Sequence, residues 1–419
     1  MFDALFTTTT EYKKLSHALS GKGACALFGL PASGRAQVYA ALCRQLDKPL
    51  CIVTPGEAEA TRFAADLNTL GIPAAVFPAR DYVLRPIEGT AREYEYRRLA
   101  VLGELVGGRL RAVAVPAEAL TQFTTPKEDF CANTRTLHAG DTLLRDDLLA
   151  ALFGAGYTRR AQVDGPGQFS VRGDIVDIFA PDQKMPVRME FWGDEIDTLH
   201  TFDLTTQRRE DAIDKFYLSP AREVLFGKPA DAAEQLRAFL AKQRGKKKTA
   251  MADCMAADLD LLDGGAVPVN MDKYLAVRYP HPATVLDYFD DPILVAEEPA
   301  SIREADRATA YRRGEELKSL ILDGVLCAGL DNLYADPSYL WSKTGHYRTI
   351  CAENFARSMP DQPLKDIINA PAHTLPAWNG EVAGLLEDLK PLCDAGYTVT
   401  LLAGTDRAAA GLARDLRDK

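Results

Sequence analysis

GYTRRAQVDGPGQFSVRGDIVDIFAP at residues 156–181 and PVRMEFWGDEIDTLHTFDLTTQRR at residues 186–209 alternate apolar and polar side chains with a period close to two. In the second segment a Gly-Asp pair at 193–194 separates two alternating runs, a pattern typical of an antiparallel hairpin. The first segment adds a third extended run over 168–179, with Gly173 at a bulge or bend. Beyond the Gly-Asp pair, one face is predicted to carry Ile196, Thr198, His200 and Phe202, and the other Asp197, Leu199 and Thr201. These patterns predict a compact antiparallel sheet of about three strands without an active-site motif, which favours an adaptor surface over a catalytic centre.

The composition is that of an acidic protein without a metal-binding or membrane-spanning pattern. The 419 residues suffice for about two to four domains. A net charge of −10 makes tight unaided binding of nucleic acid the less favoured expectation. The eight cysteines and six histidines are scattered without a CxxC pair, so we expect no metal site. Without a signal-peptide pattern or an apolar run of roughly 20 residues, we expect a cytoplasmic protein. Because the chain stops inside an amphipathic helical pattern at 412–419, we also expect it to be a piece of a longer chain.

The regions flanking the alternating segments predict an α/β fold. Buried strands at 24–28, 50–53, 74–77 and 111–115 are separated by helical patterns, which indicates βαβ units and a mostly parallel sheet. The buried strand PILVA at 292–296 continues the pattern. The predicted architecture is a degenerate P-loop, helicase-like parallel-sheet domain that is split by an inserted small antiparallel-sheet α+β domain and followed by a separate small α/β domain.

The predicted domain boundaries follow these changes of pattern. They are 1–124 for the first half of the sheet domain, 125–212 for the insertion, 213–340 for the second half and 345–419 for the small domain. Within the last domain, a strand at 398–404 is predicted between helices at 380–394 and from about 406.

The loop GLPASGRA at 29–36 has the outline of a phosphate-binding P-loop. Its defining positions are Gly29, Ser33, Gly34 and Arg35. A working P-loop needs Lys to reach the phosphates and Ser or Thr to hold Mg²⁺, whereas Arg35 and Ala36 stand at those places here. We expect a strand-to-helix turn without catalytic residues, with residual nucleotide binding as the alternative. Glu297 and Glu298 follow a buried strand, as the Walker B carboxylate does, and are interpreted as vestigial or helix-capping.

Two basic segments leave a nucleic-acid surface open as an alternative. Residues 78–98 contain Tyr82, Tyr94 and Tyr96 together with Arg80, Arg85, Arg92, Arg97 and Arg98. These side chains could stack on bases and contact phosphates, but a solvated loop followed by a helix with Arg–Glu pairs is the favoured interpretation. The run RGKKK at 244–248 is interpreted as a solvated helix–helix connection, with phosphate contact as its alternative.

The sequence VRGDIVDIF at 171–179, followed by FWGDEI at 191–196, closely resembles the second domain of the bacterial transcription-repair coupling factor (Mfd). The excision-repair protein UvrB contains the same domain. The order of the other segments agrees over essentially the whole chain. The missing Lys and Ser/Thr of the loop at 29–36 favour the coupling factor over UvrB, which keeps a working P-loop.

The resemblance implies an adaptor that recruits UvrA through the inserted domain to RNA polymerase stalled at DNA lesions. It implies that RNA polymerase and double-stranded DNA are bound through a missing C-terminal part, and that ATP and Mg²⁺ belong to missing translocase domains. This chain is then expected to be monomeric, without a cofactor, an ATPase activity or a membrane contact. A UvrB-like helicase or damage-verification protein with residual nucleotide binding is the alternative.

The resemblance also implies which side chains contact UvrA. The candidates are Arg159, Arg160, Phe169, Arg172, Phe179 and Arg188. Arginine gives bidentate contacts to carboxylates, and arginine and aromatic residues dominate interface hot spots. For Arg172 the alternative is a salt bridge within the sheet to Asp174, Glu190 or Asp197.

Overall fold

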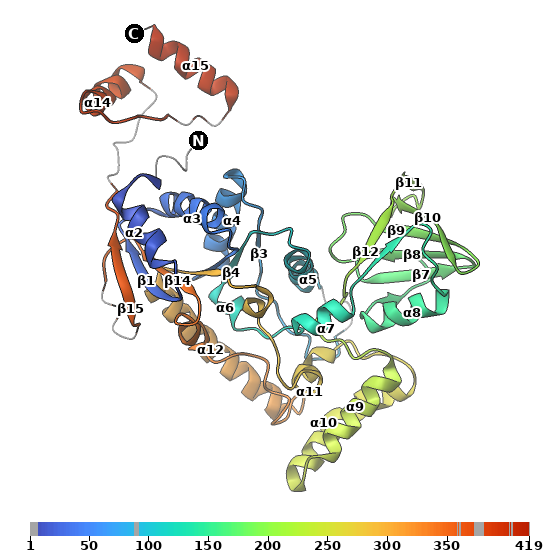
Figure 1. Cartoon of the computed structure of the whole chain (residues 1–419). Helices are drawn as coiled ribbons and strands as arrows, with labels where there is room; N and C mark the ends of the chain where they lie inside the picture. Colours follow the sequence, from blue (N-terminus) through green and yellow to red (C-terminus); the bar gives the residue numbers. More distant parts are fainter. Residues whose placement is uncertain are drawn as a thin grey trace. The chain divides into compact units, whose positions relative to one another are not determined.

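Seven parallel strands form the largest sheet, in the order β15-β1-β14-β13-β2-β4-β3 (Figure 1). Their bounds are β1 Gly23–Phe28, β2 Leu50–Thr54, β3 Ala74–Val76, β4 Ala112–Pro116, β13 Ile293–Glu297, β14 Arg348–Glu353 and β15 Leu364–Asn369. The computed structural model describes residues 7–87, 92–357, 359, 362–372, 381–401, 403 and 405–418. It divides into two units, Met1–Pro371 and Ala372–Lys419. The predicted parallel sheet is confirmed.

Helices cover both faces of this sheet, which is why its central strands are nearly continuous apolar runs. One face packs against α2 (Thr10–Ala18), α3 (Ala32–Leu46) and α4 (Glu57–Thr69). The other packs against α5 (Glu93–Val106), α6 (Ala117–Leu120), α7 (Lys127–Ala132), η2 (Val285–Tyr288), α12 (Pro299–Leu322) and α13 (Tyr339–Lys343). Every residue of β2, β4 and β13 is buried. In the described ranges, no helix combines the length and apolar character needed to cross a bilayer.

The inserted region forms a six-stranded sheet in the order β11-β10-β9-β8-β7-β6. The strands are β6 Thr158–Arg159, β7 Gln168–Arg172, β8 Ile175–Phe179, β9 Val187–Trp192, β10 Glu195–Phe202 and β11 Arg209–Ala212. Helix α8 (Arg145–Gly154) covers one face through Leu148 and Leu152. β5 (Arg135–His138) pairs with β12 (Lys215–Leu218), so the boundary predicted at 212 lies inside the insertion. The fold class is confirmed, but the prediction of about three strands is wrong.

Two local details explain why the strand count and one face assignment differ. Gly173 lies in a two-residue turn, which agrees with the bend and not with the bulge of the prediction. Its φ of +60° lets Arg172, the last residue of β7, pair with Ile175, the first residue of β8. In β10 the register shifts between Ile196 and Thr198. This bulge turns Leu199 into the core beside Ile196, although strict alternation predicted opposite faces.

A helical hairpin and a two-helix unit complete the chain. The hairpin consists of α9 (Pro229–Ala241) and α10 (Gly245–Asp263), so the run predicted as a connection at 244–248 forms the first turn of α10. The domain boundary predicted at 345 is wrong, because β14 and β15 belong to the seven-stranded sheet. The second unit contains α14 (Val382–Asp394) and α15 (Asp406–Arg417), and its described residues at 398–401 and 403 form no strand.

Two short helices follow the hairpin in the chain. They are η1 (Met271–Tyr274) and α11 (Leu275–Arg278), which pack with α9 and α10 in a third core around Tyr274 and Leu275. This core holds the hairpin to the rest of the first unit.

Candidate partner-binding surface

The inserted sheet has one face covered by α8 and one outer face. The register fixes which side chains occupy each. Phe169 pairs with Ile178 on the covered face, whereas Ser170 pairs with Asp177, and Asp177 with Arg188, on the outer face. Because side chains alternate along a strand, Arg172 also lies on the outer face.

Asp177 is a buried carboxylate that binds two guanidinium groups on this outer face. Arg188 Nε lies 2.7 Å from Asp177 Oδ1, and Arg188 Nη2 lies 2.9 Å from Oδ2. Arg172 Nη2 lies 2.6 Å from the same Oδ2, yet 46% of the Arg172 side chain stays exposed. Charge-assisted contacts of this kind hold a side chain in one geometry. Arg172 is therefore pre-positioned with free donors toward solvent, and its internal partner is Asp177, not Asp174, Glu190 or Asp197.

Three candidate contact residues are buried, which corrects the prediction made for them. Phe169 is fully buried and packs edge-to-face on Phe153, with ring centroids 5.2 Å apart. Phe179 is covered in a small cluster with Val163 and Phe202. Arg188 is buried as well, and the carbon of its guanidinium lies 4.7 Å from the Phe202 ring centroid. These three side chains pack inside the inserted domain and are not exposed to a partner.

Arg159 and Arg160 are both exposed, and neither forms an ion pair within the described part of the chain. The parallel register sets Arg159 opposite Phe169, on the face that α8 covers. Arg160 follows on the face of Ser170 and Arg172. Both arginines line an open cavity of about 730 Å³ that also touches Tyr96 and Arg222. Of the two, Arg160 is the one that extends the surface of Arg172.

Trp192 is a surface residue that the sequence reasoning missed. It is 83% exposed, more than any other exposed aromatic side chain in the described ranges. Arg172 pairs with Ile175, Ile175 pairs with Glu190, and Trp192 lies two residues further along β9 on the same face. An aromatic residue at a polar position of the alternating run 187–192 was the signal. Arg172, Ile175, Glu190 and Trp192 are called the outer strip below.

The loop between β1 and α3 does not form a phosphate cradle. Helix α3 already begins at Ala32, and Arg35 N donates to Pro31 O at 3.0 Å, so Ser33 and Gly34 are helical and only Leu30 and Pro31 separate Gly29 from the helix. Gly29 has a φ of +90°, and a Cβ at this position would come within 2.8 Å of Ala370 O. A P-loop instead turns backbone amides of an extended loop toward phosphates. Ser33 lies exposed on the first turn of the helix.

Arg35 binds the two carboxylates at the end of β13. Its Nη2 lies 3.0 Å from Glu297 Oε2, and its Nη1 lies 2.9 Å from Glu298 Oε1. The hydroxyl of Tyr39 donates to Glu297 Oε1 at 2.5 Å. The guanidinium thus supplies the positive charge that a metal–nucleotide complex would bring to these positions. Glu298 occupies the N-cap position of α12, but its side chain makes no capping hydrogen bond, so the helix-capping interpretation is wrong.

Burial raises the pKa of Glu297 to about 7, although Arg35 and Tyr39 act to lower it. The carboxyl that pairs with Arg35 therefore titrates in the neutral range. Among the residues that the structure describes, no three His, Cys, Asp or Glu side chains gather as a metal-binding group.

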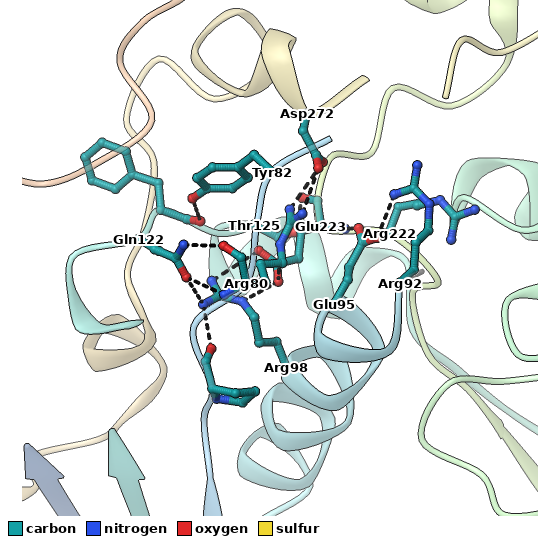
Figure 2. A network of polar contacts seen from close by, with 12 residues as sticks. Arg80, Tyr82, Arg92, Glu95, Arg98, Gln122, Thr125, Arg222, Glu223 and Asp272 are labelled. Atoms are coloured by element: carbon teal, nitrogen blue, oxygen red, sulfur yellow. Dashed lines mark hydrogen bonds and ion pairs between the residues drawn. The ribbon is translucent and has the colours of Figure 1, made fainter. Parts of the chain in front are cut away.

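The arginines of 78–98 form internal ion pairs instead of a nucleic-acid surface. Figure 2 shows Arg80 and Arg98 within a network that joins distant segments of the chain. Arg98 Nε lies 2.6 Å from Glu223 Oε1, and Arg80 Nη1 lies 2.7 Å from Asp272 Oδ2. Arg85, Arg92 and Arg97 pair with Asp323, Glu95 and Glu93. The predicted Arg–Glu pairs are confirmed. The prediction of a solvated loop is wrong for the buried Arg80, and Arg98 is buried on the inner side of α5.

Comparison with known proteins places this geometry in a family context. The UvrB interaction domain matches residues 136–224. The transcription-repair-coupling factor of Bacillus subtilis (strain 168) is 25% identical over 403 residues, which cover 94% of this chain and 34% of that protein. The factor of Myxococcus xanthus is 35% identical over 208 residues, covering 47% of this chain and 17% of that protein. That of Mycobacterium bovis is 34% identical over 257 residues, covering 59% and 20%.

The fold and site together define a parallel-sheet protein that carries an inserted interaction domain and in which Arg35, at the start of α3, pairs with Glu297 and Glu298. The similarity along most of the chain confirms the resemblance to the N-terminal region of a transcription-repair coupling factor. The chain spans about a third or less of the length of these relatives.

Proposed function

We propose that this chain is the part of a transcription-repair coupling factor that recruits UvrA, and that the recruiting surface is the outer strip together with Arg160. The observation that carries this proposal is Arg172, whose exposed guanidinium is held by the buried Asp177 within the matched interaction domain. A planar guanidinium recognises carboxylates, and an exposed tryptophan fills an apolar pocket, which together form the usual centre of a protein interface. The partner surface is therefore acidic, with an apolar recess.

The test is calorimetric titration of the chain with UvrA. Arg172→Glu should weaken binding by about 2 kcal/mol or more, because a buried hot-spot contact is replaced by a repelling charge. Lys215→Glu, an equal charge reversal at an exposed position of β12, should bind like the parent. Arg172→Gln, which keeps a donor near Asp177 but removes the charge, separates loss of contact from misfolding. Equal affinity of the Arg172 variants and the parent would move the interface elsewhere.

For the longer protein, the proposal includes ATP-dependent translocation on DNA and displacement of RNA polymerase. We assign those activities, with their ATP and Mg²⁺, to sequence outside this chain, since the loop at 29–36 is closed. The alternative of a UvrB-like helicase would require Arg35 to leave both Glu297 and Glu298. Saturable binding of a fluorescent ATP analogue with Mg²⁺ would favour that alternative.

A further inference from the structure

The link between α9 and α10, together with the first turn of α10, is a strongly basic exposed segment whose cations have no internal partner among the described residues. Five cationic residues lie within it: Lys242, Arg244, Lys246, Lys247 and Lys248. All five are exposed, and none forms an ion pair with a residue that the structure describes. We refer to these five residues as the basic tip.

The sequence around the basic tip contains no neutralising acid. No Asp or Glu occurs from Gln235 to Ala252, although acids outnumber bases in the chain, which has a net charge of −10. The nearest ion pair of the hairpin joins Arg237 to Asp263. In the other basic segment, residues 78–98, every arginine pairs with a carboxylate. The basic tip differs because its cations have no such partner among the described residues.

The hairpin is anchored along α10, from Asp258 up to Met251, which lies three residues after the basic tip. Asp258 of α10 accepts from Tyr274 OH at 2.5 Å and lies 2.5 Å from Lys273 Nζ. Leu236 of α9 and Met255 of α10 are buried in the same core. Figure 1 shows the hairpin projecting from the short helix α11. The fold thus fixes the base of the hairpin and presents its tip.

We propose that the basic tip contacts the phosphate backbone of duplex DNA without reading its sequence. The five cations repel one another, and no acid in the described part of the chain neutralises them. Binding to a polyanion relieves this repulsion and releases the counterions of the polyanion. Single strands are gripped mainly by aromatic side chains that stack on bases. The exposed aromatic residues of the described chain, Tyr94, Trp192, Tyr311, Phe355 and Tyr397, all lie outside the hairpin. This absence of a stacking platform favours a duplex, whose bases are covered.

The test is fluorescence anisotropy of a labelled random-sequence DNA duplex with the whole chain in rising salt. Lys246→Ala/Lys247→Ala/Lys248→Ala should weaken binding roughly tenfold or more at low salt. It should also reduce the magnitude of the slope of log affinity against log salt concentration by about three, because each phosphate contact contributes about 0.9 to that slope. Lys13→Ala/Lys14→Ala/Lys22→Ala removes the same charge from exposed positions of another region and should leave both quantities near the parent values.

Three results would overturn the proposal. The first is absence of binding by the parent at low salt, and the second is equal loss in the two triple variants. The third is that single-stranded DNA or a polyglutamate peptide displaces the labelled duplex at a lower concentration of charge than unlabelled duplex DNA does. That result would assign the tip to a different partner. Far-ultraviolet circular dichroism checks that α10 still forms in the variants. The tip lies outside residues 136–224, so failure here leaves the UvrA proposal unaffected.

Discussion

The guanidinium of Arg35 lies against the carboxylate of Glu297, with Nη2 3.0 Å from Oε2, and both side chains are buried. In a P-loop protein these two positions would face a phosphate and a metal ion from opposite sides. Here they neutralise each other across the junction of α3 and β13. The two side chains thus form an internal ion pair that joins the start of α3 to the end of β13.

We expect Arg35→Ala to destabilise the first unit by about 3–5 kcal/mol. The substitution leaves the buried Glu297 carboxylate without its cationic partner, and breaking a buried pair from one side has this cost at pH values above about 7, where Glu297 is ionised. The measurement is urea unfolding followed by tryptophan fluorescence. The double substitution Arg35→Met/Glu297→Leu should recover much of the loss, because apolar side chains of similar volume can replace a buried ion pair. A single variant as stable as the parent would show that the pair contributes nothing.

Stability should fall as pH rises through the range in which Glu297 titrates. Burial raises the pKa of Glu297 to about 7 from its ordinary 4.5, so the folded state binds more protons between these values. The stability contributed by this group is complete below about 4.5 and is lost as pH rises through about 7. Urea unfolding at intervals from pH 4.5 to 8 should show a loss of up to about 3 kcal/mol in the parent relative to Glu297→Gln. Parallel pH profiles would contradict this.

Glu95 provides an internal control, because its pKa is shifted in the opposite direction to that of Glu297. Burial opposes its charge, but Arg80, Arg222 and Arg92 together lower the pKa of Glu95 to about 2. Its contribution is present above about 4.5 and is lost as pH falls toward 2. Glu95→Gln should therefore lower the free energy of unfolding at all pH values above about 4.5 and should change the slope of the pH profile only below that value.

Asp177→Ala should destabilise the inserted domain by about 3 kcal/mol or more. The change leaves Arg188 buried without the carboxylate that binds its Nε and Nη2. Asp174→Ala, in the exposed turn, should stay within about 0.5 kcal/mol of the parent, as surface substitutions do. Thermal unfolding of both variants checks the prediction. Similar melting temperatures for the two would show that Asp177 does not hold the outer face together.

Trp192→Ala should reduce affinity for UvrA while leaving the stability of the chain unchanged. The side chain is 83% exposed, so it contributes little to the fold, but a tryptophan that is covered on binding commonly acts as a hot spot. We expect a loss of about 2 kcal/mol in the binding free energy. Tyr311→Ala removes another highly exposed aromatic residue, on α12, and should bind like the parent. Unchanged affinity of the Trp192 variant would remove this residue from the proposed surface.

The sequence by itself determined the elements whose patterns are local. Apolar runs between helical patterns predicted strands that now lie in the parallel sheet, and alternation around Gly193-Asp194 predicted the β9–β10 hairpin. The substitutions at Arg35 and Ala36 were enough to indicate that the loop at 29–36 lacks the groups of a working P-loop. These inferences hold because hydrophobic periodicity and side-chain chemistry act over a few neighbouring residues.

Tertiary structure alone decided where charges and aromatic rings end up. Arg172 and Arg188 look alike in sequence, but only the pairing of β7, β8 and β9 around Asp177 leaves one exposed and buries the other. Likewise, Arg35 meets Glu297 because β1 and β13 lie in one sheet although they are far apart in the chain. Such contacts depend on register and on long-range packing, which residue type and spacing do not specify.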